Sequence, residues 1–261
     1  MQEIENGLAL VTGGSSGIGL ELARCFAQDG HRLIIVAQDP AKLESVAAEL
    51  RAAGSPEVLA WSIDLSRLEG APAMFEKVRQ LAVLPDFLLL NAGTGAWGDF
   101  VGQTDLSLEL ESIHVNNISV VQAAKLFLPE MTKRGSGRVL ITSSVTAYGP
   151  SPRLAVYSAT KAFLHTFAEA VREEIAASGV TITSLLPDLT ESDFFERAHV
   201  DPDSITAREP KADPATVAKA GYEAMLKGKD HVVAPSIPGK LKALAANLLP
   251  TALITKIARA D

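Results

Sequence analysis

Thr12-Gly13-Gly14-Ser15-Ser16-Gly17-Ile18-Gly19 is the stretch that decides the fold. It follows an apolar run, Leu8–Val11, and precedes a segment with helical spacing that begins at Leu20. A strand, a glycine-rich turn and a helix N-terminus in this order form an anion site, because unpaired backbone N–H groups and the positive end of the helix dipole face one point. Glycines permit the tight turn and let a pyrophosphate approach the backbone. The stretch therefore predicts a phosphate-binding turn at the first strand of an α/β fold.

Short apolar runs rich in β-branched residues recur along the chain, and longer segments with helical spacing lie between them. Such runs suit strands buried on both faces, and parallel strands need crossover connections. We therefore expect residues 1–261 to form one α/β domain, a Rossmann fold with a doubly wound parallel sheet of about seven strands and helices on both faces. The expected strands are Leu8–Val11, Leu33–Val36, Val58–Ile63, Phe87–Leu90, Val139–Ile141, Val180–Leu186 and His231–Val233, and the expected helices are Leu20–Gln28, Ala41–Ala53, Ala73–Leu84, Val120–Arg134 and Ala162–Ala177.

Composition narrows the class of protein. The chain has 261 residues, 47% of them hydrophobic, which excludes a disordered or collagen-like chain. Its 24 Lys and Arg against 31 Asp and Glu give a net charge of −7, which disfavours a nucleic-acid partner and favours a small molecule or a protein. No apolar run reaches the length of about 18 residues that a membrane span needs. Cys25 is the single cysteine, and Met1–Asn6 lacks the apolar run of a signal peptide, so we expect a cytoplasmic protein.

Two segments interrupt the alternation of strands and helices. Residues 187–214 include a polar, proline-containing stretch, and we expect them to form an insertion or lid over the substrate site. Residues 236–261 form an apolar and basic extension that Pro250 divides. Packing on the domain or on another subunit is the first expectation for this extension, and a membrane-surface or substrate-covering role is the second.

The spacing Gly-x-x-x-Gly-x-Gly after Thr12 resembles the short-chain dehydrogenase/reductase family, and two further motifs extend the resemblance. Asp64 matches the family position that binds the adenine amino group, and Asn91-Ala92-Gly93 matches a motif beside the adenine ribose. Without the family, Asp64 is an ordinary strand-end acid and Asn91 a turn residue. The resemblance implies that NAD(P)(H) binds to Gly13, Ser15, Ser16, Gly17, Ile18, Gly19, Gln38, Asp64, Leu65, Asn91, Ala92, Gly93, Tyr157, Lys161, Pro187, Leu189 and Ser192.

Tyr157 and Lys161 are four residues apart at the start of a helical segment, so both side chains can reach a common site. A free tyrosine has a pKa of about 10, and a nearby lysine cation favours the phenolate. The same pair is common on solvated helices, so it carries weight only together with the other motifs. The family adds Ser144, which lies 13 residues before Tyr157, and Asn116 on the preceding long helix. Ser143 and Asn117 are the second-ranked candidates for these two positions.

The resemblance implies hydride transfer between nicotinamide and a secondary alcohol or ketone. Tyr157 is expected to act as general acid or base, and Ser144 to donate a hydrogen bond to the substrate oxygen. Lys161 is expected to lower the pKa of Tyr157 and bind the nicotinamide ribose, while Asn116 supports a proton relay. No metal site is expected, because the five histidines are scattered. The alternatives are a catalytically weak dinucleotide sensor and, less favoured because only a short tail follows the sixth strand, a sugar-nucleotide epimerase or dehydratase.

Four positions depart from the family pattern. Asp188 stands where the family has glycine, and Ser192 where it has threonine, in the segment that contacts the nicotinamide carboxamide. At the end of the second strand, Ala37 replaces the acid of NAD-preferring members and Gln38 the arginine common in NADP-preferring ones. The choice between NAD and NADP therefore stays open, with a slight preference for NAD.

The substrate should bind at the loops that follow the strands, Thr94–Phe100, Val145–Arg153 and Leu189–Arg208. Their aromatic residues predict a largely apolar cleft for a small alcohol or carbonyl compound. These residues are Trp97, Phe100, Tyr148, Phe194 and Phe195. By resemblance to the family, we expect a homodimer or homotetramer built through long helices.

Overall fold

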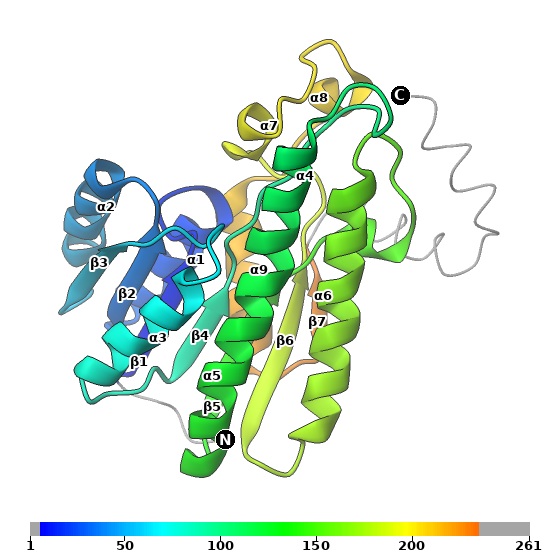
Figure 1. Cartoon of the computed structure of the whole chain (residues 1–261). Coiled ribbons are helices and arrows are strands. Elements are labelled where there is room, and N and C mark those ends of the chain that lie inside the picture. Colours follow the sequence, from blue (N-terminus) through cyan, green and yellow to red (C-terminus); the bar gives the residue numbers. More distant parts are fainter. Residues whose placement is uncertain (1–5, 235–261) are drawn as a thin grey trace.

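A single sheet of seven parallel strands, in the order β3-β2-β1-β4-β5-β6-β7, forms the centre of the protein (Figure 1). The computed structural model describes residues 6–234. The predicted Rossmann fold is confirmed, and each predicted strand is present with ends that differ by at most two residues. The strands are β1 (Leu8–Thr12), β2 (Arg32–Ala37), β3 (Val58–Ser62), β4 (Phe87–Leu90), β5 (Gly137–Thr142), β6 (Val180–Leu186) and β7 (His231–Val233).

The helices follow the predicted alternation, but two predicted helices are shifted and several elements were not predicted. The helices predicted at 73–84 and 162–177 lie at Gly70–Gln80 and Ala155–Glu174. The helices at Leu106–Ile113 and Pro214–Leu226 and four short helical turns were not predicted. Asp213 and Pro214 are a standard N-cap and first-turn pair that could have located α9. The helices are α1 (Gly17–Gln28), α2 (Pro40–Ala52), α3 (Gly70–Gln80), α4 (Leu106–Ile113), the π-helical turn η1 (His114–Ile118), α5 (Ser119–Arg134), the 3₁₀ turn η2 (Val145–Tyr148), α6 (Ala155–Glu174), α7 (Phe194–Arg197), α8 (Ile205–Arg208) and α9 (Pro214–Leu226).

Two apolar cores cover the two faces of the sheet. Helices α3, α5 and α6 pack on one face through residues such as Met74, Phe127 and Leu164. Helices α1, α2 and α9 pack on the other face, where Phe26 and Met225 are fully buried. Because both faces are covered, strands such as β1 and β4 are buried at every position, which explains their continuous apolar sequence.

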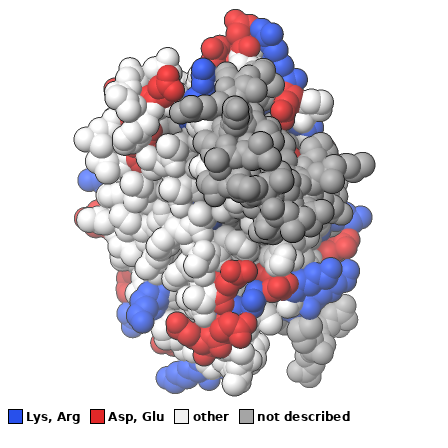
Figure 2. Space-filling view, turned by 90° about the vertical axis from the view of Figure 1, so that its right-hand side faces the viewer, with Lys and Arg blue, Asp and Glu red and all other residues white. Residues whose placement is uncertain are grey.

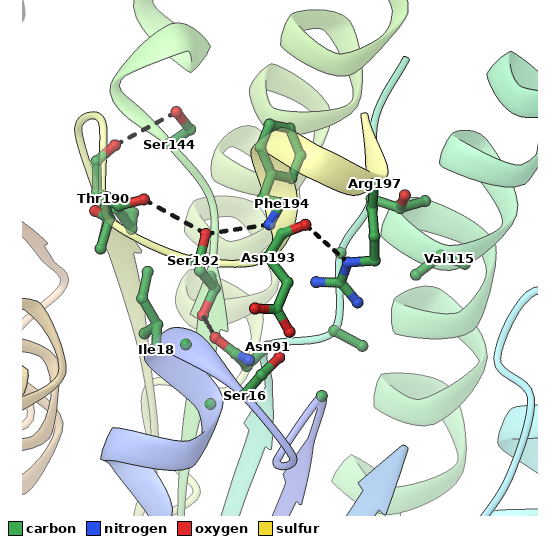
Figure 3. Close-up of a pocket in the computed structure, with 18 of the residues that line it drawn as sticks. Ser16, Ile18, Asn91, Val115, Ser144, Thr190, Ser192, Asp193, Phe194 and Arg197 are labelled. Atoms are coloured by element: carbon green, nitrogen blue, oxygen red, sulfur yellow. Dashed lines mark hydrogen bonds between the residues drawn. The ribbon is translucent and has the colours of Figure 1, made fainter. Parts of the chain in front are cut away.

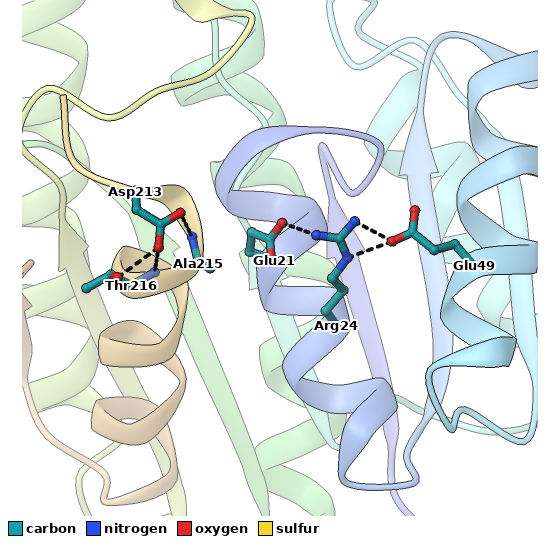
Figure 4. Close-up of polar contacts among 6 residues, drawn as sticks. All are labelled: Glu21, Arg24, Glu49, Asp213, Ala215 and Thr216. Carbon is teal, nitrogen blue, oxygen red and sulfur yellow. Dashed lines mark hydrogen bonds and ion pairs between the residues drawn. The ribbon is translucent and has the colours of Figure 1, made fainter.

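Polar contacts fix the helices on the second face (Figure 4). Arg24 of α1 pairs with Glu21 on its own helix and with Glu49 of α2. Asp213 caps α9, because its carboxylate accepts the backbone N–H groups of Ala215 at 3.3 Å and Thr216 at 3.0 Å. The Arg24–Glu49 pair is solvent-exposed and contributes little to stability, whereas the Asp213 cap stabilises the start of α9.

The strand order reverses between β1 and β4: the chain continues from β1 to β2 on one side and from β4 to β5 on the other. At such a reversal, neighbouring connections leave in opposite directions and open a crevice at the carboxyl ends of the strands. The short helices α7 and α8 lie above this end of the sheet (Figure 1). The topology therefore places a binding site between the glycine turn and the segment that follows β6.

The segment 187–214 contains α7, α8 and irregular backbone, and its role as a lid stays a prediction. The extension 236–261 lies outside the described residues. Among residues 6–234, no helix is long and apolar enough to cross a membrane. On the face shown in Figure 2, acidic and basic side chains lie next to one another around the margin.

Candidate functional site

A cavity of about 470 Å³ lies at the carboxyl ends of the central strands. Its walls come from the glycine turn, the end of β2, the loops after β4 and β5, and the segment after β6. Figure 3 shows this segment above the glycine turn, with Ser192 and Asp193 close to Ile18 and Ser16. The cavity therefore brings together parts of the chain that are far apart in sequence.

The glycine turn is held by contacts that leave no space for side chains. Gly13 and Gly17 have φ of +66° and +53°, which favour glycine. A Cβ added at Gly19 would lie 2.1 Å from the Gly13 carbonyl oxygen and 2.5 Å from Asn91 Nδ2. Thr12 Oγ1 accepts the backbone N–H of Asn91 at 2.9 Å and so joins β1 to the residue after β4. The turn predicted from sequence is thus a tight cradle of backbone atoms.

Tyr157 and Ser144 meet at the inner end of the cavity. Tyr157 lies in the first turn of α6, and Ser144 lies between β5 and η2, where it caps η2. Burial raises the pKa of Tyr157 to about 12, and a hydrogen bond with the Ser144 side chain opposes this rise. We expected Lys161 to lower the pKa of Tyr157. In the protein without a cofactor, the net change of this pKa is upward. The cause is desolvation of the phenolate, which outweighs the other contributions.

Lys161 is 3% exposed and reaches the same region from the next turn of α6. Its Nζ donates to the Thr142 carbonyl oxygen at 2.9 Å and lies 5.6 Å from the centre of the Tyr157 ring. Burial lowers the pKa of Lys161 to about 8. Ser143, the second-ranked serine, donates to the Lys161 carbonyl oxygen at 2.7 Å, so its hydroxyl is used to anchor α6.

Asn116 is fully buried in the π-helical turn η1. Its side chain accepts the Thr94 N–H and donates to the Thr94 carbonyl oxygen, each at 2.9 Å. A Cβ added at Gly93 would lie 3.3 Å from both Asn116 Oδ1 and Lys161 Nζ, so these two groups approach one point. Asn117 instead donates to the Thr160 carbonyl oxygen at 3.0 Å. The π-turn, a form often found at functional sites, thus directs two adjacent asparagines to α6.

Most residues predicted for the cofactor line the cavity, as do three of the four predicted catalytic residues. Asn116 is fully buried and does not line the cavity, and neither does Asp64, whose Oδ1 accepts from Gln38 Nε2 at 2.7 Å and from Ser66. The predicted residues that line it are Gly13, Ser15, Ser16, Gly17, Ile18, Gly19, Gln38, Leu65, Asn91, Ala92, Gly93, Ser144, Tyr157, Lys161, Pro187, Leu189 and Ser192.

The aromatic residues predicted for the substrate cleft divide into two groups. Phe194 and Phe195 line the cavity, and the Phe194 ring lies 4.9 Å from the Tyr157 ring. The prediction was wrong for the other three, which are not part of its wall. Trp97 packs against the Arg153 guanidinium, Tyr148 against the His165 ring, and Phe100 is 56% exposed.

Sequence reasoning missed four charged residues of the cavity wall, Lys42, Glu111, Asp193 and Arg197. Lys42 Nζ and Asp193 Oδ2 form an ion pair at 2.8 Å across the cavity mouth. Lys42 lies in the first turn of the helix after β2, and this position could have predicted a place at the cavity. Nothing in the sequence predicts its pairing with Asp193. Within the described part of the chain, no three His, Cys, Asp or Glu side chains are grouped as metal ligands.

Comparison with known proteins places this geometry in a family. The family described as short chain dehydrogenase matches residues 7–202. The chain belongs to the short-chain dehydrogenase/reductase family. It is therefore an oxidoreductase by family, as the sequence motifs predicted.

Relatives of known name are similar over different lengths. "Dehydrogenase/reductase SDR family protein 7-like" of Drosophila melanogaster is 28% identical over 256 residues, which are 94% of this chain and 77% of that protein. "Probable oxidoreductase EphD" of Mycobacterium tuberculosis is 32% identical over 215 residues, but these cover only 36% of that longer protein. A short-chain dehydrogenase from Sphingobium yanoikuyae, solved in complex with NADPH, is 27% identical with a TM-score of 0.82 over 95% of each chain.

Replacing Gly19 with alanine should disrupt the cradle, because the new Cβ would overlap backbone and Asn91 atoms. We expect Gly19→Ala to lower the free energy of unfolding by about 2 kcal/mol or more, and to weaken dinucleotide binding at least about 10-fold. Gly102→Ala is the matched control, since a Cβ there meets nothing within 4 Å. Urea unfolding measures the change in stability, and nucleotide titration measures the change in affinity. Equal behaviour of the two variants would contradict the role of Gly19 in a tight dinucleotide-binding turn.

The buried Lys161 predicts a pH-dependent stability. Its pKa is lowered from 10.5 to about 8 by burial, so between these values the unfolded chain holds a proton that the folded protein lacks. The free energy of unfolding contributed by this group therefore rises with pH in that window, by up to about 3 kcal/mol. The measurement is urea unfolding of the wild type and of Lys161→Met at several pH values. Above pH 8, the free energy of unfolding of the wild type should increase relative to that of the variant. A pH-independent difference would refute this expectation.

Proposed function

We propose that the protein is an NAD(P)-dependent oxidoreductase that transfers a hydride between nicotinamide and a secondary alcohol or ketone. The observation that carries the proposal is that the Tyr157, Ser144 and Lys161 side chains line the same cavity as the glycine cradle. A hydroxyl pair of this kind can bind and protonate one substrate oxygen.

The residues fit a nicotinamide dinucleotide. The cradle is closed to any Cβ at Gly19, and its backbone N–H groups lie at the N-terminus of α1, as pyrophosphate binding requires. The Sphingobium relative was solved with NADPH, which supports the same kind of cofactor here. When bound, the nicotinamide supplies or accepts the hydride. We assign its pyrophosphate to the glycine turn and its ribose to Lys161 and the loop Asn91–Gly93.

The side chains then have distinct roles. Tyr157 gives its proton to the carbonyl oxygen during reduction and takes it back during oxidation, while Ser144 donates a hydrogen bond to the same oxygen. At neutral pH the raised pKa of Tyr157 keeps its hydroxyl protonated, as reduction requires. The Lys161 cation, close to the Tyr157 ring, stabilises the phenolate that remains. Asn116 positions the chain around Gly93 and Thr94, and we retain its predicted part in a proton relay.

Apolar side chains form part of the cavity wall. Leu154, Leu189, Phe194 and Val200 line it, so we propose a small apolar alcohol or carbonyl compound as substrate. The alternative of a weakly active dinucleotide sensor is not favoured, because Tyr157, Ser144 and Lys161 all converge on one cavity. The cytoplasmic location predicted from the sequence stays a prediction.

Removal of the Tyr157 hydroxyl should separate chemistry from binding. We expect Tyr157→Phe to lower turnover by about 10²- to 10⁴-fold because the proton donor is lost, while the affinity for NADH or NADPH changes by less than about 3-fold. The assay follows loss of reduced-nicotinamide absorbance with a panel of apolar ketones and aldehydes. Tyr148→Phe, which removes a hydroxyl outside the cavity wall, is the control and should retain turnover. Full activity of Tyr157→Phe would overturn its role.

An apolar groove between α4–α5 and α6 supports the expected homo-oligomer. Phe100, Ile118, Val121 and Phe163 line it, and Phe163 is 46% exposed. Leu106 and Leu110 on the outer side of α4 are also exposed. A second copy of the chain is the occupant we propose, because a homodimer would bury this face symmetrically.

A charge placed in the groove should dissociate such a dimer. We expect Phe163→Glu to shift the protein toward the monomer, because each copy would bury an unpaired carboxylate in the contact. Leu68→Glu alters a leucine of similar exposure, 53%, that is outside the groove and should leave the assembly unchanged. Sedimentation velocity at micromolar concentration measures both, and a monomeric wild type would contradict the proposal.

A further inference from the structure

The cavity has a corner beside the glycine turn where the end of β2, the start of α2 and the segment after β6 meet. In Rossmann folds, an acidic side chain that follows the second strand binds the adenosine ribose hydroxyls of NAD, and a cation accommodates the 2′-phosphate of NADP. Here the strand ends at Ala37, which offers neither group. The residues that contact the ribose must therefore come from elsewhere in this corner.

The two polar residues after Ala37 are engaged in other contacts. Gln38 Nε2 donates to Asp64 Oδ1 at 2.7 Å. Asp39 Oδ1 accepts the backbone N–H groups of Ala41 at 2.9 Å and of Lys42 at 3.1 Å, so its carboxylate caps α2. Gln38 has no carboxylate, and Asp39, the nearest acid in the sequence and part of the cavity wall, uses its Oδ1 for this cap.

A carboxylate reaches the corner from the opposite side. Asp193, directly before α7, accepts Lys42 Nζ at 2.8 Å, and the nearby Ser16 side chain also contributes to lowering its pKa. Figure 3 shows the Asp193 side chain directed toward Ser16. The segment rests on the glycine turn itself, because a Cβ at Gly17 would lie 3.0 Å from Ser192 Cβ. The Asp193 carboxylate thus lies between the two elements that flank an adenosine ribose.

We propose that Asp193 is the residue that selects the cofactor: its carboxylate accepts hydrogen bonds from the adenosine ribose hydroxyls of NAD(H) and repels the 2′-phosphate of NADP(H). The inference rests on the proposed function and deepens it. The selecting acid comes from the segment after β6 rather than from the end of β2.

Lys42 has a second part in this arrangement. While Asp193 is present, its carboxylate neutralises the Lys42 ammonium and leaves the corner unfavourable for another anion. Both side chains are nearly half exposed, so their ion pair is weak and can rearrange around a ribose. Arg197, whose Nε donates to the Asp193 carbonyl oxygen at 3.3 Å, adds a second cation nearby. Loss of the Asp193 charge would therefore make the corner cationic and suited to a phosphate.

The test is a titration of the wild type and of Asp193→Asn with NADH and NADPH, followed by nicotinamide fluorescence at fixed ionic strength. We expect the wild type to bind NADH at least about 10-fold more tightly than NADPH, and Asp193→Asn to shift this ratio at least about 10-fold toward NADPH. Asp203→Asn is the matched control: it neutralises an acid of the same segment that pairs with Arg208 outside the cavity wall, and should leave the ratio unchanged.

A double variant identifies the cation. In Asp193→Asn/Lys42→Met, the gain in NADPH affinity should disappear, because Lys42 holds the phosphate. Four outcomes would each overturn the inference. The wild type could prefer NADPH, or Asp193→Asn could leave the ratio of NADH to NADPH affinity unchanged. Asp203→Asn could shift this ratio equally, or the gain in NADPH affinity could persist in the double variant. Loss of both nucleotides in Asp193→Asn, with an unchanged melting temperature, would also overturn it by making Asp193 a general clamp. Failure of the wild type to bind either nucleotide would instead refute the proposed function.

Discussion

The close contact between the start of α1 and the loop that follows β1 is the constraint on which the site depends. Gly19 lies against the Gly13 carbonyl and the Asn91 amide, and no other residue fits there. Thr12 Oγ1 accepts the backbone N–H of Asn91, the first residue after β4. This bond joins the carboxyl ends of β1 and β4 where the strand order reverses. The crevice, the cradle and the positions of the loops after β4 and β5 all follow from this junction.

Burial determines the chemistry of the inner end of the cavity. The same low-dielectric surroundings raise the pKa of Tyr157 and lower the pKa of Lys161, because each neutral form is favoured over its charged form. The protein alone therefore holds a protonated phenol beside a lysine whose charge is only moderately stable. Charge that arrives with a bound cofactor acts strongly in such surroundings, since little water is present to screen it.

The strands and the glycine turn could be predicted because they depend on local pattern: continuous apolar runs buried on both faces, and glycines at a strand–helix junction. Ser144 and Asn116 were located only through the family resemblance, since neither has a distinctive local pattern. The pair Lys42–Asp193 joins residues 151 positions apart and leaves no periodic signal. The raised pKa of Tyr157 and the outward placement of Phe100 are likewise tertiary properties, which depend on how neighbouring elements cover a side chain.

The π-helical turn η1 makes the position of Asn116 depend on chain length as well as on residue type. A π-turn is an α-helix that holds one extra residue. Deleting one residue between His114 and Ile118 would restore a regular helix and turn everything on one side of it by about 100° relative to the other. Either Asn116 would then leave the Thr94 backbone or α5 would lose its packing on α3. A change in the length of this segment should therefore disrupt the site even where Asn116 itself is retained.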